Sequence, residues 1–316
     1  MTRAVEAPDP RAVERARHRR AGVILLLVCA TLWSLNGILV KVTSADPIVF
    51  AGLRSLVAAV AVLPFLRAFD GARPPAGVMS LSVLFHTLMV AFFIAAISWG
   101  TAAAGVILQY TGPAWVALIA WGVQRRRLAA STWCAVALTC LGVLAMIAVP
   151  LWREPAFDPV GPGCGLAAGV AFGALIVMLE KTDRDAVHPI TGRAGVNPIW
   201  VIGINNAGTA VLLLPAACLT DRLHLTPGQL GLIAFCGVVQ HALPYLLFQL
   251  GLRRVTAVEA SLLVLLEPIL SPTWVALFWG EMPTRWDIIG GSAILAALLL
   301  VAVRRSPGST HPAVAD

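Results

Sequence analysis

The feature that most constrains this chain is a series of ten apolar stretches, each near the ~20 residues that an α-helix needs to cross a bilayer. Most connections between them are short, and those around 151–160, 181–197 and 219–228 are longer. The sequence therefore predicts an all-α polytopic membrane protein with ten transmembrane helices. The expected spans are residues 21–41, 47–67, 78–99, 101–123, 130–150, 161–180, 198–218, 229–250, 255–280 and 286–303.

The composition agrees with this class. Hydrophobic residues make up 59% of the 316 positions and charged residues 12%, whereas soluble domains carry about a quarter charged residues. The net charge of +7 does not indicate a nucleic-acid partner, because the basic residues cluster in the N-terminal tail and the short connections. The six cysteines form no CxxC pair, so we expect no metal site and no cofactor, and packing is favoured over a disulfide between Cys164 and Cys218.

The distribution of Lys and Arg predicts the orientation, because cytoplasmic connections retain basic residues. With the N-terminus inside, 18 basic residues fall on the cytoplasmic side, 4 fall outside, and Arg54 lies within a span. Residues 1–20 and 304–316 are therefore expected to be cytoplasmic tails of a multi-pass protein of the cell membrane. A secretory signal is the alternative for the first stretch, but its apolar helix continues to Val40 and further spans follow.

Residues 258–281 combine an apolar stretch with charge. They are hydrophobic enough to span a bilayer, yet they include Glu267, Pro268 and Pro272. Glu267 lies about 18 Å from the basic end of the span at ~1.5 Å per residue, near the middle of a hydrocarbon core ~30 Å thick. A carboxyl group at this depth is expensive, and we expect it to bind and release a coupling proton. A hydrogen bond that only fixes helix packing is the alternative.

The two halves of the chain resemble each other at a fixed separation. Four pairs of identical residues are separated by 151 positions, which indicates a duplication, although apolar helices can also match by chance. The pairs are Pro47 with Pro198, Ile48 with Ile199, Gly52 with Gly203, and Pro64 with Pro215.

A second match joins the later helices of each half. Pro113-Ala-Trp-Val-Ala-Leu118 reappears as Pro272-Thr-Trp-Val-Ala-Leu277, although Pro268 is an alternative partner for Pro113. If each half contributes five helices, the second enters the membrane with opposite polarity. That inverted-topology repeat is the architecture used for alternating access, with a site at the repeat interface.

These motifs resemble the drug/metabolite transporter superfamily, and within it the EamA-type members with ten spans in two five-helix repeats. The most specific part is Leu266-Glu267-Pro268 followed by Gly280-Glu281. The resemblance implies a first EamA-like repeat over 21–150 and a second over 161–303. It also implies transport of small metabolites, amino acids or drug-like compounds. The chain departs from the family where the first repeat often has a Gly-Glu pair, because it has Gly122-Val-Gln-Arg-Arg-Arg127.

Three further charged residues have specific expectations. Arg54 lies within a span and is expected either to hold a substrate carboxylate or to make permanent structural bonds. Glu259 is about a turn from Arg253 and Arg254, so interfacial pairing with them is expected. Glu281 ends its span and is expected to cap a helix or form a pair.

Polar and amphipathic residues inside the spans are candidates for lining a substrate cavity. An aromatic wall with a few polar groups is what a small-molecule pocket requires. Helix packing is nevertheless the commoner role of such residues, and it is the favoured role of the two histidines within spans, His86 and His241. The candidate substrate-binding residues are Trp33, Asn36, Arg54, His86, Gln109, Tyr110, Asn205 and His241, with Asn206, Tyr245 and Gln249 as further cavity candidates, and the expected hinges are Pro113, Pro268 and Pro272.

The function that these features favour is a secondary active transporter, working as an exporter and using protons as the candidate coupling ion. No GxxxxGK[ST] phosphate loop is present to hydrolyse ATP. The alternative is an intramembrane enzyme acting on a lipid-linked or small-molecule substrate, but no catalytic cluster or HExxH motif supports it. A channel is also disfavoured, since no ring of charges is evident. The expected partners are a small-molecule substrate and the bilayer.

Overall fold

The computed structural model describes residues 10–185 and 195–304, which form helices and their connections. Within these ranges the one β contact is an isolated bridge between Ala72 and Val196. The helices are α1 (Pro10–Ser34), α2 (Asn36–Thr43), α3 (Pro47–Val62), α4 (Ala76–Trp99), α5 (Ala102–Gln109), α6 (Gly112–Gly122), α7 (Ala130–Val143), α8 (Val149–Arg153), α9 (Val160–Asp185), α10 (Pro198–Leu219), α11 (Pro227–Phe235), α12 (Leu243–Leu252), α13 (Ala257–Val264), α14 (Glu267–Trp279) and α15 (Arg285–Arg304), with a 3-10 turn at Leu63–Phe65 and π-helical segments at Leu144–Ala148 and Cys236–Ala242.

Ten segments of the described chain are long and apolar enough to cross a membrane, which confirms the expected number. Their ends differ from the expected ones by a few residues. Spans one, four and nine each consist of two helices, namely α1–α2, α5–α6 and α13–α14.

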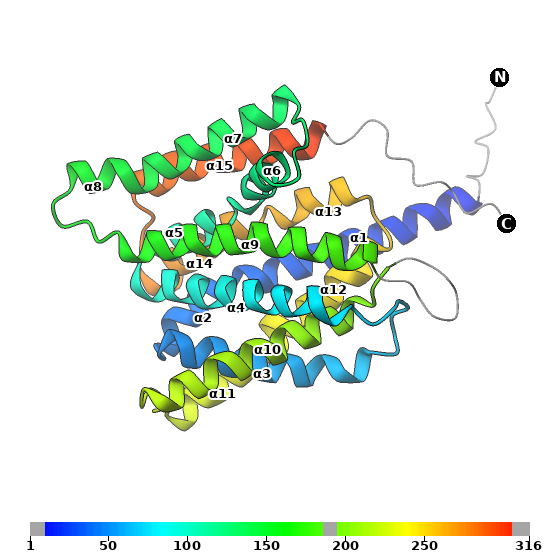
Figure 1. The fold of residues 1–316 in the computed structure, drawn as a ribbon, viewed down its shortest axis with the longest axis horizontal. Helices are drawn as coiled ribbons and strands as arrows, with labels where there is room; N and C mark the ends of the chain where they lie inside the picture. Colours follow the sequence, from blue (N-terminus) through cyan, green and yellow to red (C-terminus); the bar gives the residue numbers. More distant parts are fainter. Residues whose placement is uncertain (1–9, 186–194, 305–316) are drawn as a thin grey trace, which may run out of the picture.

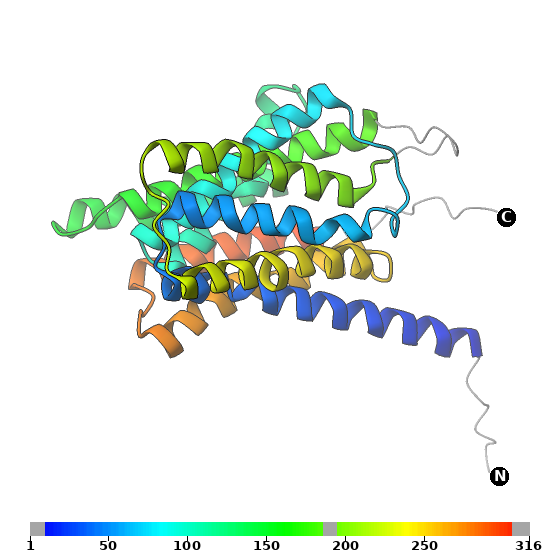
Figure 2. The same cartoon turned by 90° about the horizontal axis from the view of Figure 1, so that it is seen from below.

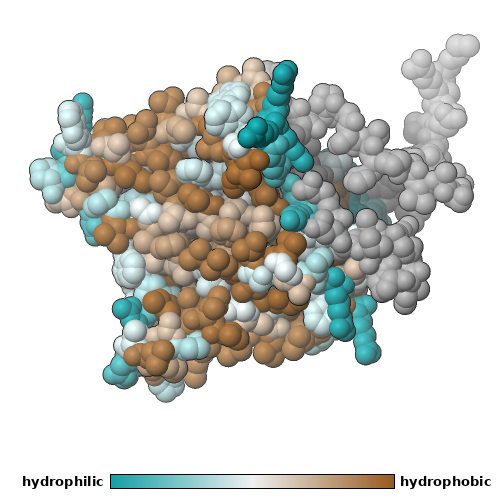
Figure 3. All heavy atoms as spheres, in the orientation of Figure 1, coloured by the Kyte–Doolittle hydropathy of each residue, from teal (hydrophilic) through white to brown (hydrophobic). Residues whose placement is uncertain are grey.

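The spans form a bundle with two polar ends. The start of α1 and the end of α15 lie at the same end, which we call the terminal face, and the connection between α8 and α9 lies at the other end, which we call the opposite face (Figures 1 and 2). Hydrophilic side chains gather at the two ends, and an apolar band covers the helices between them (Figure 3). Large apolar side chains such as Val211, Leu277 and Phe278 are exposed within the spans, as expected for contact with lipid.

The two halves pack mainly against each other. Helix α4 lies along α9, α3 along α10, α1 along α12, and α7 along α15. Each of these pairs joins one helix from the first five spans to one from the last five. The protein interior is therefore largely the interface between two inverted five-helix repeats.

Matching helix starts support the duplication. Asp46 caps α3 by accepting from the backbone N–H of Ile48, and Asn197 caps α10 by accepting from the N–H of Ile199. Each cap is followed by a proline, which needs no hydrogen bond at the first helical position.

The broken spans four and nine correspond at a slightly different separation. Helices α5 and α13 each have 8 residues, and their caps Thr101 and Thr256 are separated by 155 positions. Pro113 is the second residue of α6 and Pro268 the second residue of α14, again separated by 155. The structure thus aligns Pro113 with Pro268, and the alignment with Pro272 is displaced by about one helical turn.

A row of glycines on α9 allows the broken span four to pack closely. Gly165, Gly169 and Gly173 recur at every fourth position, so they lie on one face of the helix. A methyl group added at each would meet a main-chain oxygen of span four, at 3.1 Å for Gly165, 2.6 Å for Gly169 and 2.8 Å for Gly173. Small residues at such contacts permit close approach of backbones in membranes.

Gly169→Ala is expected to destabilise the protein by about 1–3 kcal/mol, because the added methyl group would press on the backbone at the break in span four. Thermal unfolding in detergent, followed by tryptophan fluorescence, measures the change. Gly163→Ala is the matched control on the same helix, since a methyl group there meets nothing within 4 Å. An equal loss of stability in both variants would contradict this account of the contact.

Candidate functional site

A cavity of about 820 Å³ lies between the two repeats. It reaches from the breaks in spans four and nine, at Pro113 and Leu265, towards the terminal face, where Thr182, Pro198 and Ala302 line it. Its volume is typical of a site for a small organic molecule. The full lining is Trp33, Tyr110, Pro113, Phe172, Ile176, Leu179, Thr182, Val196, Pro198, Val201, Ile202, Tyr245, Phe248, Gln249, Ser261, Val264, Leu265, Leu298, Val301 and Ala302.

The cavity wall is mainly aromatic and aliphatic. The Trp33 ring packs edge-on against Tyr245, with centroids 5.3 Å apart, and lies 5.6 Å from the Phe248 ring. Polar atoms come from Tyr110, Tyr245 and a few Ser, Thr and Gln side chains, and no charged side chain of the described residues lines the cavity. This environment suits a neutral, largely apolar or aromatic ligand.

A buried carboxyl group lies behind the wall where the two broken spans meet. Tyr110 follows the last residue of α5, and its hydroxyl donates a hydrogen bond to Glu267 Oε2 at 2.8 Å. Glu267 is the first residue of α14 and is 9% exposed. One hydroxyl group therefore links an ionisable site to the cavity wall.

Arg54 lies in a separate buried cluster and does not line the cavity. Its Nη1 donates to Asn36 Oδ1 at 3.0 Å and to Gln240 Oε1 at 3.4 Å, and its guanidinium carbon lies 5.6 Å from the Phe50 ring centre. Asn36 is the first residue after the break in span one. Among the described residues Arg54 forms no ion pair, and its Nε has no hydrogen-bond partner. Amide oxygens thus hold this cation, rather than a carboxylate or helix-end carbonyls.

His86 and His241 do not line the cavity and instead lie close to polar groups of a neighbouring helix, although His241 also packs edge-on against the cavity residue Tyr245, with ring centroids 5.2 Å apart. His86 Nδ1 lies 2.9 Å from Thr209 Oγ1, and His241 Nε2 lies 2.9 Å from Asn206 Oδ1. Asn205 accepts a hydrogen bond from the Ser82 hydroxyl at 3.1 Å. These contacts connect α4 and the π-helical segment of span eight to α10.

The remaining candidates divide in the same way. Of the eight candidate substrate-binding residues, Trp33 and Tyr110 line the cavity. Two of the further cavity candidates, Tyr245 and Gln249, also line it. Gln109 is half-buried next to the break in span four but does not contribute to the lining. Of the expected hinges, Pro113 borders the cavity, while Pro268 and Pro272 are buried in α14.

Most of the cavity wall was not among the sequence candidates. Phe172, Ile176 and Leu179 on α9 and Val201 on α10 are apolar residues in apolar spans, so nothing in the sequence separates them from lipid-facing neighbours. Ser261 is an exception that the sequence could have identified as a cavity residue, because it is a hydroxyl residue in the otherwise apolar run 260–266.

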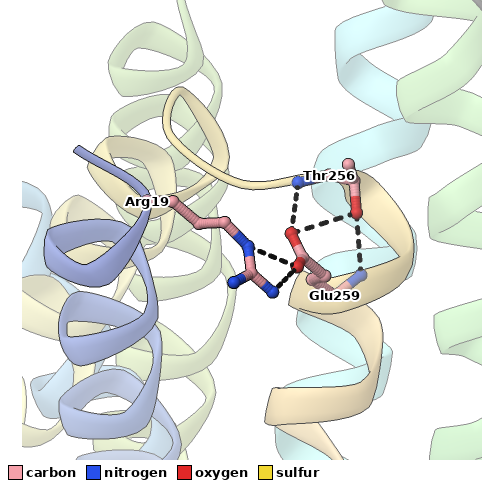
Figure 4. Close-up of polar contacts among 3 residues, drawn as sticks. All are labelled: Arg19, Thr256 and Glu259. Atoms are coloured by element: carbon pink, nitrogen blue, oxygen red, sulfur yellow. Dashed lines mark hydrogen bonds and ion pairs between the residues drawn. The ribbon is translucent and has the colours of Figure 1, made fainter. Parts of the chain in front are cut away.

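The expected pairing of Glu259 with Arg253 or Arg254 is wrong. Glu259 pairs with Arg19 of α1 and also accepts a hydrogen bond from the backbone N–H of Thr256, in a capping box at the start of α13 (Figure 4). The capping box directs Glu259 back over the helix start towards α1, and the Arg253 guanidinium instead stacks over the Phe69 ring at 4.4 Å. The pair joins spans one and nine at the terminal face.

Polar contacts close the opposite face. Glu281 accepts from Lys41 Nζ at 2.7 Å and from the backbone N–H of Ala102 at 2.7 Å, so the expectation that it caps or pairs is confirmed. Asp46 pairs with Arg222 at 2.9 Å. These contacts tie together the ends of spans one, four and nine and the connection before span eight.

A more exposed pair lies at the same face. Glu154 accepts hydrogen bonds from Trp286 Nε1 at 2.7 Å and from the Arg285 guanidinium at 3.0 Å. These two donors hold the pKa of the Glu154 carboxyl below its usual range.

Comparison with known proteins gives consistent matches. The model of the EamA-like transporter family matches residues 20–148 and 161–303. The chain is 29% identical over 286 residues to an uncharacterized transporter of Archaeoglobus fulgidus, covering 90% of this chain and 97% of that protein. It is 26% identical over 289 residues to the uncharacterized transporter YwfM of Bacillus subtilis, covering 88% and 92%. A solved crystal structure shares the fold at 16% identity, with a TM-score of 0.61, covering 92% of this chain and all of that one.

The Lys41–Glu281 pair is expected to contribute more to stability than the exposed Arg285–Glu154 pair. The side chains of the first pair are 13% and 22% exposed, and those of the second 69% and 39%. Double-mutant cycles to Ala, read from unfolding in detergent, should give a coupling energy of about 1–3 kcal/mol for the first pair and ~0–1 kcal/mol for the second. Equal coupling energies would contradict the expectation that the less exposed Lys41–Glu281 pair contributes more to stability.

Proposed function

The chain belongs to the EamA-like transporter family, and from this premise we propose that it is a secondary active transporter of small, largely apolar organic molecules. The observation that carries this proposal is the cavity between the inverted repeats, which extends towards one face while ion pairs close the other. The uncharged wall favours neutral drug-like or aromatic compounds over free amino acids, whose ammonium and carboxylate groups would lose hydration there without a charged partner.

The bias of basic residues supports a cytoplasmic location for the terminal face and for both termini, with the protein as a multi-pass component of the cytoplasmic membrane. The cavity then faces the cytoplasm in this conformation. In export, the direction we propose, this conformation receives substrate. Transport then requires the contacts around Lys41 and Glu281 to open while the terminal face closes, as in alternating access between inverted repeats.

Proton coupling is proposed for Glu267. While its carboxyl group is ionised, Tyr110 donates a hydrogen bond to it. When the carboxyl group binds a proton, it can itself act as a donor, and the Tyr110 hydroxyl is released to contact a ligand. Proton binding would thus change both the cavity wall and the contact between the two broken spans.

The lining also favours transport over catalysis. Its hydroxyl groups come from Ser261, Thr182 and two tyrosines, but among the described residues the lining includes no His, Asp, Glu, Lys or Cys to activate a nucleophile. An enzyme acting within the membrane would need such a group near the bound substrate.

Flux into and out of proteoliposomes tests the transporter assignment. A panel of neutral aromatic compounds, amino acids and organic cations would be supplied with and without an imposed pH gradient. We expect movement of neutral, largely apolar members and faster movement with the gradient. Recovery of a chemically altered compound without net movement would favour an enzyme instead.

Glu267→Gln is expected to abolish accumulation driven by a pH gradient and to preserve exchange of substrate across the liposome membrane. Gln retains a hydrogen-bond acceptor for Tyr110 but cannot bind a proton at neutral pH. Both activities would be measured in the same vesicles, with Glu154→Gln at the exposed opposite face as the control. Unchanged pH-driven accumulation in Glu267→Gln would rule out a coupling role for this residue.

A further inference from the structure

Three consecutive arginines form the turn between α6 and α7. Arg125, Arg126 and Arg127 border an open pocket of about 670 Å³, together with Trp121, Leu128 and Trp133. The turn is the segment in which the chain departs from the Gly-Glu pair of the family, and neither the cavity nor the coupling site uses it.

The three guanidinium groups are exposed and without counter-ions in the described part of the chain. The backbone of the turn is nevertheless fixed. Arg125 has φ of 54°, a left-handed conformation that costs energy for a residue with a side chain. The N–H of Arg126 donates to the carbonyl of Ala120 at 2.9 Å, which folds the turn back onto the end of α6. The arginines therefore extend from an ordered and strained turn.

The equivalent turn of the second repeat is neutralised within the protein. At the separation of 155 positions, Arg125 corresponds to Gly280, with φ of 77°, and Arg126 corresponds to Glu281. Glu281 is paired with Lys41. Both turns thus have a residue of positive φ at the corresponding position, but the first repeat has three cations where the second has one paired anion, and their counter-charge must come from outside the described chain.

The surroundings of the turn indicate where that counter-charge comes from. The turn connects two membrane spans, so it emerges at the level of lipid headgroups, and Figure 3 shows hydrophilic side chains gathered there beside the apolar band. The rings of Trp121 and Trp133 pack edge-on with centroids 5.3 Å apart and are 53% and 39% exposed. Tryptophan concentrates at membrane interfaces, and arginine binds phosphate through paired hydrogen bonds.

We propose that this turn is a binding site for an anionic phospholipid. The phosphate group would lie among Arg125, Arg126 and Arg127, and the start of the acyl chains would lie against Trp121 and Trp133. A soluble anion would make no use of these exposed rings, whereas a lipid satisfies both the charge and the apolar surface.

Native mass spectrometry of the purified full-length protein, titrated with phosphatidylglycerol or phosphatidylcholine, tests the proposal. The test variant carries Arg125→Gln, Arg126→Gln and Arg127→Gln. The matched control carries Arg17→Gln, Arg20→Gln and Arg67→Gln, which remove the same charge from exposed positions elsewhere on the terminal face. A gain of about fivefold in affinity per basic residue near an anionic membrane surface predicts a loss on the order of a hundredfold for the test variant.

The wild type and the control are expected to bind phosphatidylglycerol equally well and in preference to phosphatidylcholine. If the triple variant does not fold, Arg126→Gln and Arg127→Gln are tested singly, with an expected loss of about fivefold each. Undiminished binding by the arginine variants, or an equal loss in the control, would overturn the proposal. Displacement of the lipid by an equal concentration of inorganic phosphate would also overturn it in favour of a simple anion site.

Discussion

A helix that breaks inside a bilayer exposes backbone groups that lipid cannot satisfy, and this constraint shapes the protein. Spans one, four and nine break at Leu35, Tyr110 and Leu265. Tyr110 and Leu265 line the cavity, and Leu35 is half-buried. Tyr110 spans the gap between two of these breaks by donating to Glu267 and, at 3.4 Å, to the carbonyl of Val264. The shorter hydrogen bond gives the buried Glu267 carboxyl group a partner. The longer contact places the same hydroxyl near a backbone carbonyl that the break in span nine leaves without its helical partner.

The two repeats share a backbone plan but differ in chemistry at corresponding positions. Gly112 and Glu267 each begin the helix after a break, yet only the second repeat has an ionisable group there. In the first repeat the smaller residue permits close packing against α9, since a methyl group added at Gly112 would lie 2.6 Å from the Phe172 ring. One break is thus closely packed against α9, and the other places a buried carboxyl group beside the cavity wall, where we propose that it binds a proton.

Charges at the two faces differ in a way that suits alternating exposure. The opposite face is held by Lys41 with Glu281 and by Asp46 with Arg222, and among the described residues of the terminal face Arg19 pairs with Glu259. Each of these pairs joins the first span, or the connection that follows it, to the second half of the chain. In the alternating access that we propose, movement of one repeat against the other would break or form these pairs, and they would then contribute to the relative stability of the two conformations.

The sequence alone determined the ten spans, the inverted duplication and the intramembrane carboxyl group of Glu267, because hydropathy, the parity of five helices and residue type are properties of short segments or simple counts. It could not determine which polar residues share a cavity. Arg54, His86 and His241 look as suitable in the sequence as Trp33 and Tyr110. In the structure, however, their polar atoms contact Gln240, Thr209 and Asn206, respectively. Each helix is rotated about its axis by packing against helices of the other repeat, often more than a hundred positions away. Only the tertiary structure therefore decided which side chains face the cavity, which join helices, and that Glu259 meets Arg19 rather than its basic neighbours.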